Sequence, residues 1–310
     1  MNVLVYGAGV LGSYLAHVLA RGGNEVSLLA RGKRAEELEK DGLVIRHYFQ
    51  RKTTVDRVRV IRSLEPDHHF DLIFVVMKYT DFASILPILA ANKSENIVLV
   101  GNNVDADEMQ TYVHEHSPIP KNIAFGFQTT AGRRENGRVD CIRIGPGQMV
   151  IGGLDGEIPF RSALDQAFSK TKYKLIYEEN IDAWLKNHII LIVAMNFVIV
   201  IHSYQMKNIA RDSQMLRKMI AAMNEGFQVL ESLGYPLIPA AQASLVRKYP
   251  GLMRLVMKIF HMLPASQLVD GSVDEIAALS RVFRRWKKQT GVRTPHWDAL
   301  EEQFNNAMTP

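Results

Sequence analysis

A glycine-rich turn near the N-terminus is the feature that most constrains how this chain can fold. The apolar run at residues 2–6 is followed by Gly7, Gly9 and Gly12, spaced as Gly-x-Gly-x-x-Gly, and a helical pattern begins there. A strand that feeds such a turn into a helix is typical of a dinucleotide-binding βαβ unit, in which helix N-terminal amides meet the pyrophosphate. A second strand pattern at residues 25–30 disfavours the alternative, a glycine turn without a ligand. The expected cofactor cradle is Gly7, Ala8, Gly9, Val10, Leu11 and Gly12.

The residue after the second strand distinguishes the two nicotinamide cofactors. An acidic side chain there would bind the ribose 2′-hydroxyl of NAD, whereas an arginine accommodates the 2′-phosphate of NADP. This chain has Arg31, with Lys33 and Arg34 close behind. A solvated basic turn is the alternative, since exposed Arg and Lys are common. The sequence favours NADPH, and no metal is expected because the histidines do not fall in a metal-ligand spacing.

Length and patterning predict two domains. The chain has 310 residues, of which 47% are hydrophobic and 22% charged, as in an ordinary globular chain of about two domains. In residues 1–176, short apolar runs alternate with helical patterns, which indicates an α/β domain with a Rossmann-type doubly wound sheet. The strand patterns then stop and long helical patterns follow. Residues 177–310 are therefore expected to form an all-helical domain for substrate binding or dimerisation, and a homodimer is compatible with this organisation.

Composition restricts the partners and the location. The formal net charge is +5, but the basic residues are spread along the chain, so an anionic cofactor and a small anionic substrate explain the charge better than nucleic acid. The basic run at residues 281–288 is interpreted as a solvated helix face. The apolar run at 189–201 is shorter than the roughly 20 residues of a membrane span, so no membrane partner is expected. The single cysteine, Cys141, and the lack of a signal pattern favour a reducing cytoplasmic location.

Two polar residues follow strands of the expected sheet. Lys78 comes directly after the apolar run at 71–77, and Asn102 follows the run at 96–100. Ligands of open α/β sheets bind at the carboxyl ends of strands. A lysine in such a place is often only a surface residue. Two polar strand ends beside a dinucleotide cradle nevertheless favour contacts with the cofactor or the substrate.

These features resemble those of the ketopantoate reductases, also called 2-dehydropantoate 2-reductases, over nearly the full length of the chain. The glycine cradle and Arg31 match the places where that family binds NADPH, and the strand ending in Lys78 looks like its counterpart. Asn102 matches the asparagine of the family's Asn-Gly loop, and Trp184 and Lys186 are similar to its Trp-x-Lys signature. The resemblance implies a two-domain, NADPH-dependent reductase of a 2-oxo acid with a place in pantothenate biosynthesis.

The resemblance also implies roles in the chemistry. Lys186 would be the catalytic acid and Glu275 would contact the substrate, while Asn102 and Lys78 would bridge cofactor and substrate. Carbonyl reduction needs a positioned cation that stabilises and then protonates the oxygen on which charge develops. A lysine just before an apolar helix is expected to be partly desolvated. The competing interpretations are a snorkelling lysine at a helix end and, for Glu275, a capping box that begins at Ser272.

Several polar groups of the family are missing from the substrate half. The family helix carries asparagines four and eight residues after the lysine, and these places are Ile190 and Ala194 here. Asn187 and Asn196 point to other faces of a regular helix and do not replace them. Removing a buried partner typically costs about 1 to 3 kcal/mol. The resemblance therefore implies ketopantoate or a related 2-oxo acid as the expected substrate, and the alternative is a non-catalytic NADPH-binding sensor or regulator. Other positions at which the chain departs from the family pattern are Asn103, Leu263, Pro264, Ser266, Ala277 and Ser280.

Overall fold

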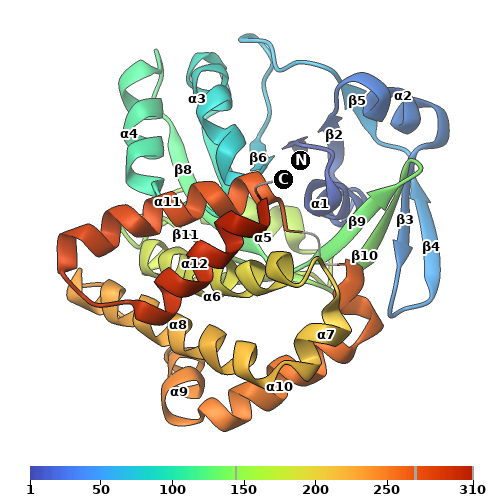
Figure 1. Ribbon diagram of the computed structural model, residues 1–310. Coiled ribbons are helices and arrows are strands. Elements are labelled where there is room, and N and C mark those ends of the chain that lie inside the picture. Colours follow the sequence, from blue (N-terminus) through green and yellow to red (C-terminus); the bar gives the residue numbers. More distant parts are fainter. Residues whose placement is uncertain (144, 269–270, 309–310) are drawn as a thin grey trace. The chain divides into compact units, whose positions relative to one another are not determined.

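The computed structural model describes residues 1–143, 145–268 and 271–308 and forms two compact units, Met1–Ile181 and Asp182–Pro310 (Figure 1). All strands of the described residues belong to the first unit, and the second unit is helical. An α/β unit followed by a helical region confirms the fold class predicted from the sequence.

An eight-stranded sheet forms the centre of the first unit, in the order β12-β11-β8-β7-β6-β1-β2-β5. The stretch β5-β2-β1-β6-β7-β8 is parallel throughout, and it follows the 3-2-1-4-5-6 order of the doubly wound dinucleotide fold. The strands are β1 (Asn2–Tyr6), β2 (Glu25–Leu29), β5 (Arg59–Ile61), β6 (Leu72–Val76), β7 (Asn96–Val100), β8 (Asn122–Gln128), β11 (Gln148–Gly152) and β12 (Lys174–Tyr177).

Burial explains why several of these strands are apolar along their whole length. Every residue of β6 is buried, as expected for a parallel strand covered on both faces. β11 differs from the parallel strands because it runs antiparallel to β8, with Met149 paired to Gln128. The other elements that accompany the sheet are α1 (Val10–Arg21), α2 (Gly32–Asp41), the 3-10 turn η1 (Tyr79–Asp81), α3 (Phe82–Ala91), α4 (Ala106–His116) and α5 (Arg161–Phe168).

A separate four-stranded sheet, in the order β4-β3-β10-β9, contacts α1 in the first unit. Hydrophobic periodicity does not predict this sheet, because β4 (Lys52–Asp56) and β9 (Ala131–Glu135) are rich in polar and charged residues. Gly132 brings β9 close to its neighbours: its φ is +151°, and a Cβ there would lie 2.0 Å from the Asp140 carbonyl oxygen and 3.1 Å from Val10 Cγ1. The remaining strands are β3 (Leu43–His47) and β10 (Arg138–Ile142).

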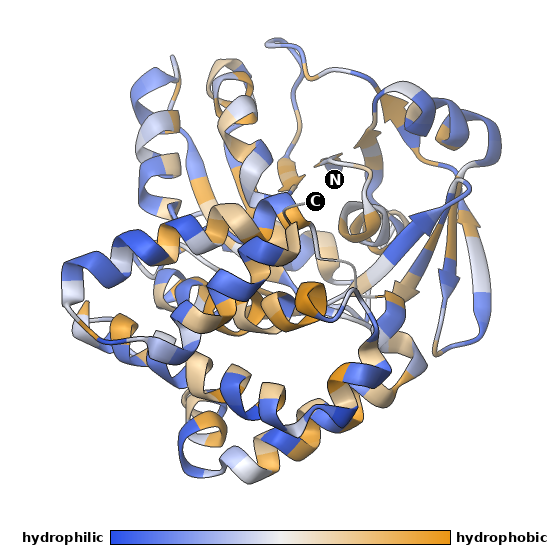
Figure 2. Ribbon diagram, in the orientation of Figure 1, coloured by the Kyte–Doolittle hydropathy of each residue, from blue (hydrophilic) through white to orange (hydrophobic). Residues whose placement is uncertain are grey.

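The second unit is built around the apolar helix α6 (Ile181–Ile201), whose hydropathy is visible in Figure 2. This helix is long and apolar enough to cross a membrane, but 72% of its most apolar window is buried, as in the core helix of a globular unit. Residues 240–262 form two helices that are divided at Pro250, since a proline fits the first turn of a helix but not its interior. The other helices are α7 (Met206–Arg211), α8 (Ser213–Ser232), α9 (Ala240–Lys248), α10 (Pro250–Met262), the 3-10 turn η2 (Pro264–Leu268), α11 (Val273–Thr290) and α12 (Pro295–Met308).

Candidate active site

The glycine turn after β1 has the geometry of a phosphate cradle. Gly7 has a φ of +120°, and a Cβ there would lie 2.3 Å from the Val76 carbonyl oxygen of β6. A Cβ at Gly12 would lie 1.9 Å from the Gly7 carbonyl oxygen, so α1 can approach the turn only because residue 12 is a glycine. A Cβ at Gly9, in contrast, would meet no atom within 4 Å. The first glycine thus permits the turn, the third permits close helix packing, and the second borders open space.

The first turn of α1 offers the donors that such a cradle needs. Gly9 is the N-cap residue, and no acidic side chain occurs in the first turn. The amides of a first turn lack intrahelical acceptors, and the helix dipole favours an anion beside them. These amides and the open space at Gly9 fit the pyrophosphate of a dinucleotide. The residues that would hold it are Gly7, Ala8, Gly9, Val10, Leu11 and Gly12.

Arg34 supports the cradle from inside the protein. Its side chain donates to the Ala8 carbonyl at 3.3 Å, to the Gly137 carbonyl at 2.8 Å and to Ser13 Oγ at 3.2 Å. The residue is buried, and this burial lowers the pKa of its guanidinium. The sequence grouped Arg34 with the basic residues after the second strand, but its donors are directed at the protein. Gly137 lies 103 residues away along the chain, so no local pattern indicates this role.

Arg31 lies at the position expected for the cofactor-selecting residue. It follows β2, and its Nη2 donates to the Tyr6 hydroxyl at 2.6 Å, with the guanidinium 5.9 Å from the centre of the Tyr6 ring. Burial raises the pKa of Tyr6, and the positive charge of Arg31 opposes that rise. Both Arg31 and Lys33 are exposed. Since Tyr6 directly precedes the glycine turn, Arg31 presents an accessible cation next to the cradle.

Lys78 and Asn102 occur at the same sheet edge as the cradle. β1, β6 and β7 are adjacent parallel strands, so their carboxyl ends lie side by side. The loops after β6 and β7 are joined by a hydrogen bond from the Tyr79 hydroxyl to the Asp105 carboxylate. Lys78 is exposed and Asn102 is half-buried. The structure therefore brings both residues to the edge where open α/β sheets bind ligands.

In the second unit, Lys186 of α6 lies among aromatic side chains. The residue is only 7% exposed, and its Nζ donates to the Asp182 carboxylate one helical turn earlier. Nζ lies 4.8 Å from the centre of the Tyr235 ring and 6.0 Å from that of Trp286. Aromatic faces and a carboxylate both stabilise an ammonium group. A snorkelling lysine would hold its charge in water, which does not fit this burial.

The departures from the family pattern are packed into the protein. Asn103, at the glycine of the family's Asn-Gly loop, is fully buried and donates to the Leu99 carbonyl at 2.8 Å. Ile190 and Ala194 are also fully buried. A Cβ at Gly226 of α8 would lie 2.5 Å from Ile190 Cγ2, so this isoleucine fills the space that the glycine leaves. Position 190 therefore packs helix against helix.

The other asparagines of α6 are engaged with the backbone. Asn187 donates to the carbonyls of Ala183 and Pro236 at 2.8 and 2.9 Å. Asn196 donates to the Ile192 carbonyl at 2.8 Å. Neither amide nitrogen replaces the polar groups that the family pattern has at positions 190 and 194.

Glu275 lies in the first turn of α11 and is half-buried. Ser272 is the N-cap residue of that helix, but its side chain makes no capping hydrogen bond, so the reciprocal capping box is incomplete. Two serines near the family's substrate positions have structural partners: Ser266 donates to the Leu263 carbonyl at 2.7 Å, and Ser280 donates to the carboxylate of Glu301.

Two histidines of the second unit have pKa values below that of a free histidine. His188 stacks on Trp184 with ring centres 5.1 Å apart, and burial lowers its pKa to about 4. Burial also lowers the pKa of His261, whose Nδ1 lies 2.7 Å from the Met257 carbonyl oxygen. Within residues 1–143, 145–268 and 271–308, no group of three or more His, Cys, Asp or Glu could hold a metal ion.

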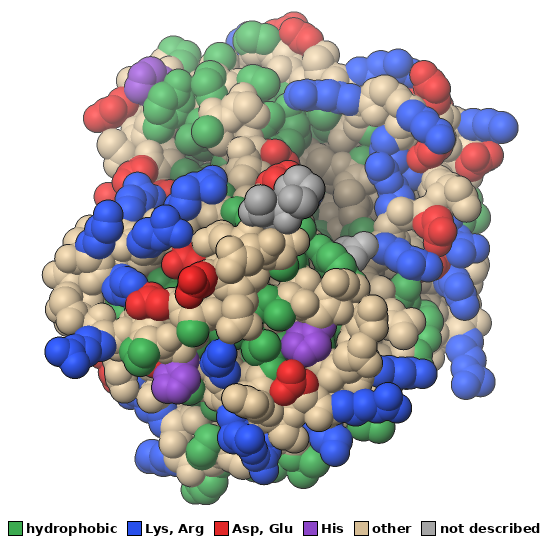
Figure 3. Space-filling model, in the orientation of Figure 1, with side chains coloured by type: hydrophobic (Ala, Val, Ile, Leu, Met, Phe, Trp, Pro, Cys, Tyr) green, Lys and Arg blue, Asp and Glu red, His purple; other side chains and the backbone are tan. Residues whose placement is uncertain are grey.

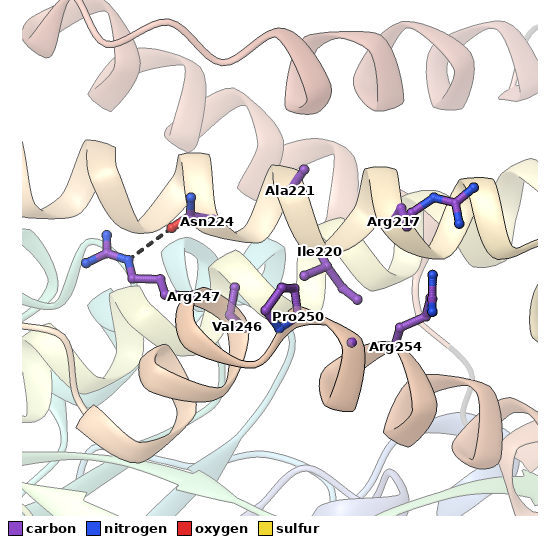
Figure 4. Close-up of a pocket in the computed structure, with 9 residues that line it drawn as sticks. Arg217, Ile220, Ala221, Asn224, Val246, Arg247, Pro250 and Arg254 are labelled. Carbon is purple, nitrogen blue, oxygen red and sulfur yellow. Dashed lines mark hydrogen bonds between the residues drawn. The ribbon is translucent and has the colours of Figure 1, made fainter.

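A groove of about 350 Å³ opens between α8, α9 and α10 of the second unit (Figure 4). Ile220, Val246 and Pro250 contribute apolar surface to it. At one end of the groove, Arg247 donates to Asn224 at 3.0 Å and makes two hydrogen bonds to the Glu231 carboxylate. Arg217 and Arg254 line the opposite end. The groove does not include any residue predicted to bind the cofactor or the substrate.

The fold and the cradle together define a dinucleotide-binding α/β protein with a helical second unit. Residues 3–156 match the family model described as ketopantoate reductase PanE/ApbA. The chain belongs to this family, and the match covers the glycine cradle, the strand ends at Lys78 and Asn102, and most of the first unit.

Known proteins are similar to the chain in sequence or in fold. The "uncharacterized oxidoreductase YkpB" of Bacillus subtilis (strain 168) is 27% identical over 191 residues, and the match covers 60% of this chain and 61% of that relative's length. The PanE/ApbA family ketopantoate reductase of Ralstonia eutropha JMP134 has a similar fold, with a TM-score of 0.77, 22% identity and coverage of 99% and 98% of the two chains. A D-mandelate dehydrogenase with NADH and anilino(oxo)acetate gives a TM-score of 0.74, 18% identity and coverage of 99% and 98%.

Proposed function

We propose that the protein is an NADPH-dependent oxidoreductase that reduces the ketone of a 2-oxo acid, either ketopantoate or a relative of it. The observation that carries this proposal is the open cradle at Gly9 beside the exposed cation of Arg31. The cradle supports a bound dinucleotide, and the cation supports a cofactor with a 2′-phosphate. A cytoplasmic enzyme of pantothenate biosynthesis is the corresponding expectation from the family.

In this proposal Lys186 supplies the proton. When bound in the cradle, a nicotinamide cofactor would supply the hydride, and the chain would have to stabilise the charge that develops on the carbonyl oxygen. The Lys186 ammonium stabilises this charge and donates its proton to the oxygen. The Asp182 carboxylate accepts a hydrogen bond from this ammonium group and fixes its direction. The rings of Tyr235 and Trp286 limit the access of water to it, which strengthens these electrostatic interactions.

The surroundings of Lys186 support a substrate with an apolar substituent. Ile190 and Ala194 are fully buried within the second unit and provide no hydrogen-bond partner for a substrate hydroxyl, and the neighbouring rings of Tyr235 and Trp286 are largely apolar surfaces. Leaving one substrate hydroxyl unpaired costs about 1 to 3 kcal/mol. We therefore expect ketopantoate, which carries a hydroxyl, to have a kcat/KM roughly tenfold to a hundredfold below that of a similar 2-oxo acid without one.

The proposed acid is tested by Lys186→Met with Lys288→Met as the matched control. Lys288 is exposed on α11, so its loss should leave activity unchanged. Loss of a general acid lowers kcat by roughly 10² to 10⁴-fold, whereas the Kd of NADPH should stay the same. The measurement is NADPH oxidation against a panel of aliphatic and aromatic 2-oxo acids, combined with a fluorescence titration of NADPH. Equal kcat in the two variants would remove Lys186 from the mechanism.

A non-catalytic NADPH sensor or regulator is the second candidate, and the loss of polar groups at Ile190 and Ala194 favours it. The same panel distinguishes the two functions. Tight NADPH binding without oxidation by any 2-oxo acid, in single-turnover experiments at high protein concentration, would support the sensor. Oxidation that depends on Lys186 would support the enzyme.

A further inference from the structure

The groove between α8, α9 and α10 combines apolar walls with arginines at both ends (Figure 4). Its volume of about 350 Å³ falls within the roughly 300–1,000 Å³ that is usual for small-molecule pockets. Ile220, Val246 and Pro250 contribute the apolar walls, and the first two of these residues are buried. The nine residues that line the groove include three arginines and no carboxylate. This composition is complementary to an anion that carries an apolar group.

The arginine at one end of the groove is already neutralised by the protein. Arg247 donates to the two carboxylate oxygens of Glu231 at 2.7 and 2.6 Å. These hydrogen bonds raise the pKa of Arg247 and lower that of Glu231, as in a stable ion pair. A guanidinium paired in this way has little charge left for a ligand. This end of the groove is therefore polar but close to neutral.

The two arginines at the opposite end have no such partner. Arg217 extends from α8 and Arg254 from α10, and both side chains lie at this end of the groove (Figure 4). Across the described part of the chain, neither guanidinium group forms an ion pair. Arg217 is exposed and Arg254 is half-buried, so both are accessible to a ligand. Guanidinium groups bind oxyanions through paired N–H donors. The positive charge of the groove is thus concentrated at the end formed by Arg217 and Arg254.

The helices that border the groove add positive charge to it. Residues 232–268, which include all of α9 and α10, contain no Asp or Glu. In the lowest part of Figure 3, where these two helices lie, Lys and Arg side chains occur among hydrophobic ones. A cleft surrounded by charge of one sign raises the local concentration of oppositely charged ligands. The surroundings of the groove therefore favour an anion over a neutral ligand.

We propose that this groove binds a small amphipathic anion, namely a medium-chain carboxylate. Its two carboxylate oxygens would accept hydrogen bonds from Arg217 and Arg254, and its chain would lie along Ile220, Val246 and Pro250. The arginines orient the head group, and each methylene removed from water tightens binding roughly fourfold. None of the residues proposed to hold the cofactor or to reduce the substrate lines the groove. The carboxylate is therefore a further ligand of the protein, bound within the second unit.

A bare inorganic anion is the competing occupant, because two arginines are sufficient to hold one. The apolar walls distinguish the two possibilities. They continue from the arginines toward the neutral end of the groove, and an ion without a chain would leave this surface in contact with water. Covering it adds binding free energy that only an amphipathic ligand can gain.

The first test is isothermal titration calorimetry of the full chain with octanoate. Acetate has the same head group without the chain, and octanamide has the same chain without the charge. Each should bind roughly tenfold or more weakly than octanoate, because each lacks one of the two interactions. Acetate binding as tight as that of octanoate would leave only a site for a simple anion, and equally tight binding of octanamide would leave only an apolar cleft. Either result, or no binding of octanoate at millimolar concentrations, would overturn the proposal.

The second test locates the binding site with variants. Arg217→Gln/Arg254→Gln should raise the Kd of octanoate roughly tenfold or more, since the head group loses its charged donors. The control Arg281→Gln/Lys288→Gln alters exposed positions on α11 and should leave this Kd unchanged. Neither altered arginine of the groove is fully buried, so the circular dichroism spectrum of the first variant should match that of the wild type.

The same titration separates the groove from the proposed substrate site. Lys186→Met should bind octanoate as tightly as the wild type does, because Lys186 does not line the groove. Binding that is lost in Lys186→Met but kept in Arg217→Gln/Arg254→Gln would place octanoate beside the proposed catalytic lysine and overturn the proposal. Binding that is lost only in the arginine variant would support the groove whether or not the protein reduces a 2-oxo acid.

Discussion

Gly9→Ala is expected to separate cofactor binding from folding. Gly9 has φ −71° and ψ −166°, a conformation open to alanine, and a Cβ there meets no protein atom within 4 Å. The methyl group would instead occupy the space through which a pyrophosphate reaches the amides of α1. The folded chain therefore tolerates the substitution, while the proposed ligand does not.

The size of the effect follows from the donors that the methyl group separates from the phosphate. Hydrogen bonds to charged groups contribute about 1.5 to 3 kcal/mol each. Loss of one such bond, about 2 kcal/mol, raises the Kd of NADPH roughly thirtyfold. The melting temperature should stay within a few degrees of the wild type or rise slightly, because alanine restricts the unfolded chain more than glycine does.

Two further glycines serve as references in the same assay. At Gly12 a Cβ would lie 1.9 Å from a backbone oxygen, so Gly12→Ala should lower the melting temperature as well as the affinity. At Gly251 a Cβ meets nothing within 4 Å, so Gly251→Ala should lower neither the melting temperature nor the affinity for NADPH. Fluorescence titration with NADPH and thermal unfolding by circular dichroism measure both quantities. A Gly9→Ala variant with unchanged NADPH affinity would refute the assignment of the cradle.

Two other substitutions test the electrostatics of the two units. Arg31→Ala should raise the Kd of NADPH by roughly tenfold or more while leaving that of NADH unchanged, since only NADPH carries the 2′-phosphate; equal losses for both cofactors would argue against a selecting role. His188 has its pKa lowered by burial from 6.5 to about 4, so its contribution to stability is fully present above pH 6.5 and is lost as the pH falls toward 4. Denaturant unfolding should show a decrease over that interval to which His188 contributes up to about 3 kcal/mol, and His188→Asn should remove this share. A decrease as large in the variant as in the wild type would contradict this.

The sequence predicts the first unit well because its signals are local. A glycine turn between a strand and a helix predicts the position of the cradle, and Arg31 is recognised because it follows the next strand. The role of Arg34 could not be predicted from the sequence, because its partners Ala8, Ser13 and Gly137 contact it only in the folded unit. The four-stranded sheet could not be predicted either, since strand register and the close approach at Gly132 define its strands better than hydrophobic alternation does.

The sequence alone could not explain the apolar residue at position 190, where the family pattern has an asparagine. Such a residue could either border a substrate cavity or pack against another helix. If Ile190 bordered a cavity, its apolar side chain would simply leave a substrate group unpaired. Instead it is fully buried and fits the space left by Gly226, so these two positions depend on each other in the packing of α6 against α8. An asparagine restored at 190 alone would lie against that glycine. If Lys186 is the proposed acid, substrate selectivity around it would depend on how these helices pack, and Asp182 and the aromatic rings would be the groups that surround its ammonium.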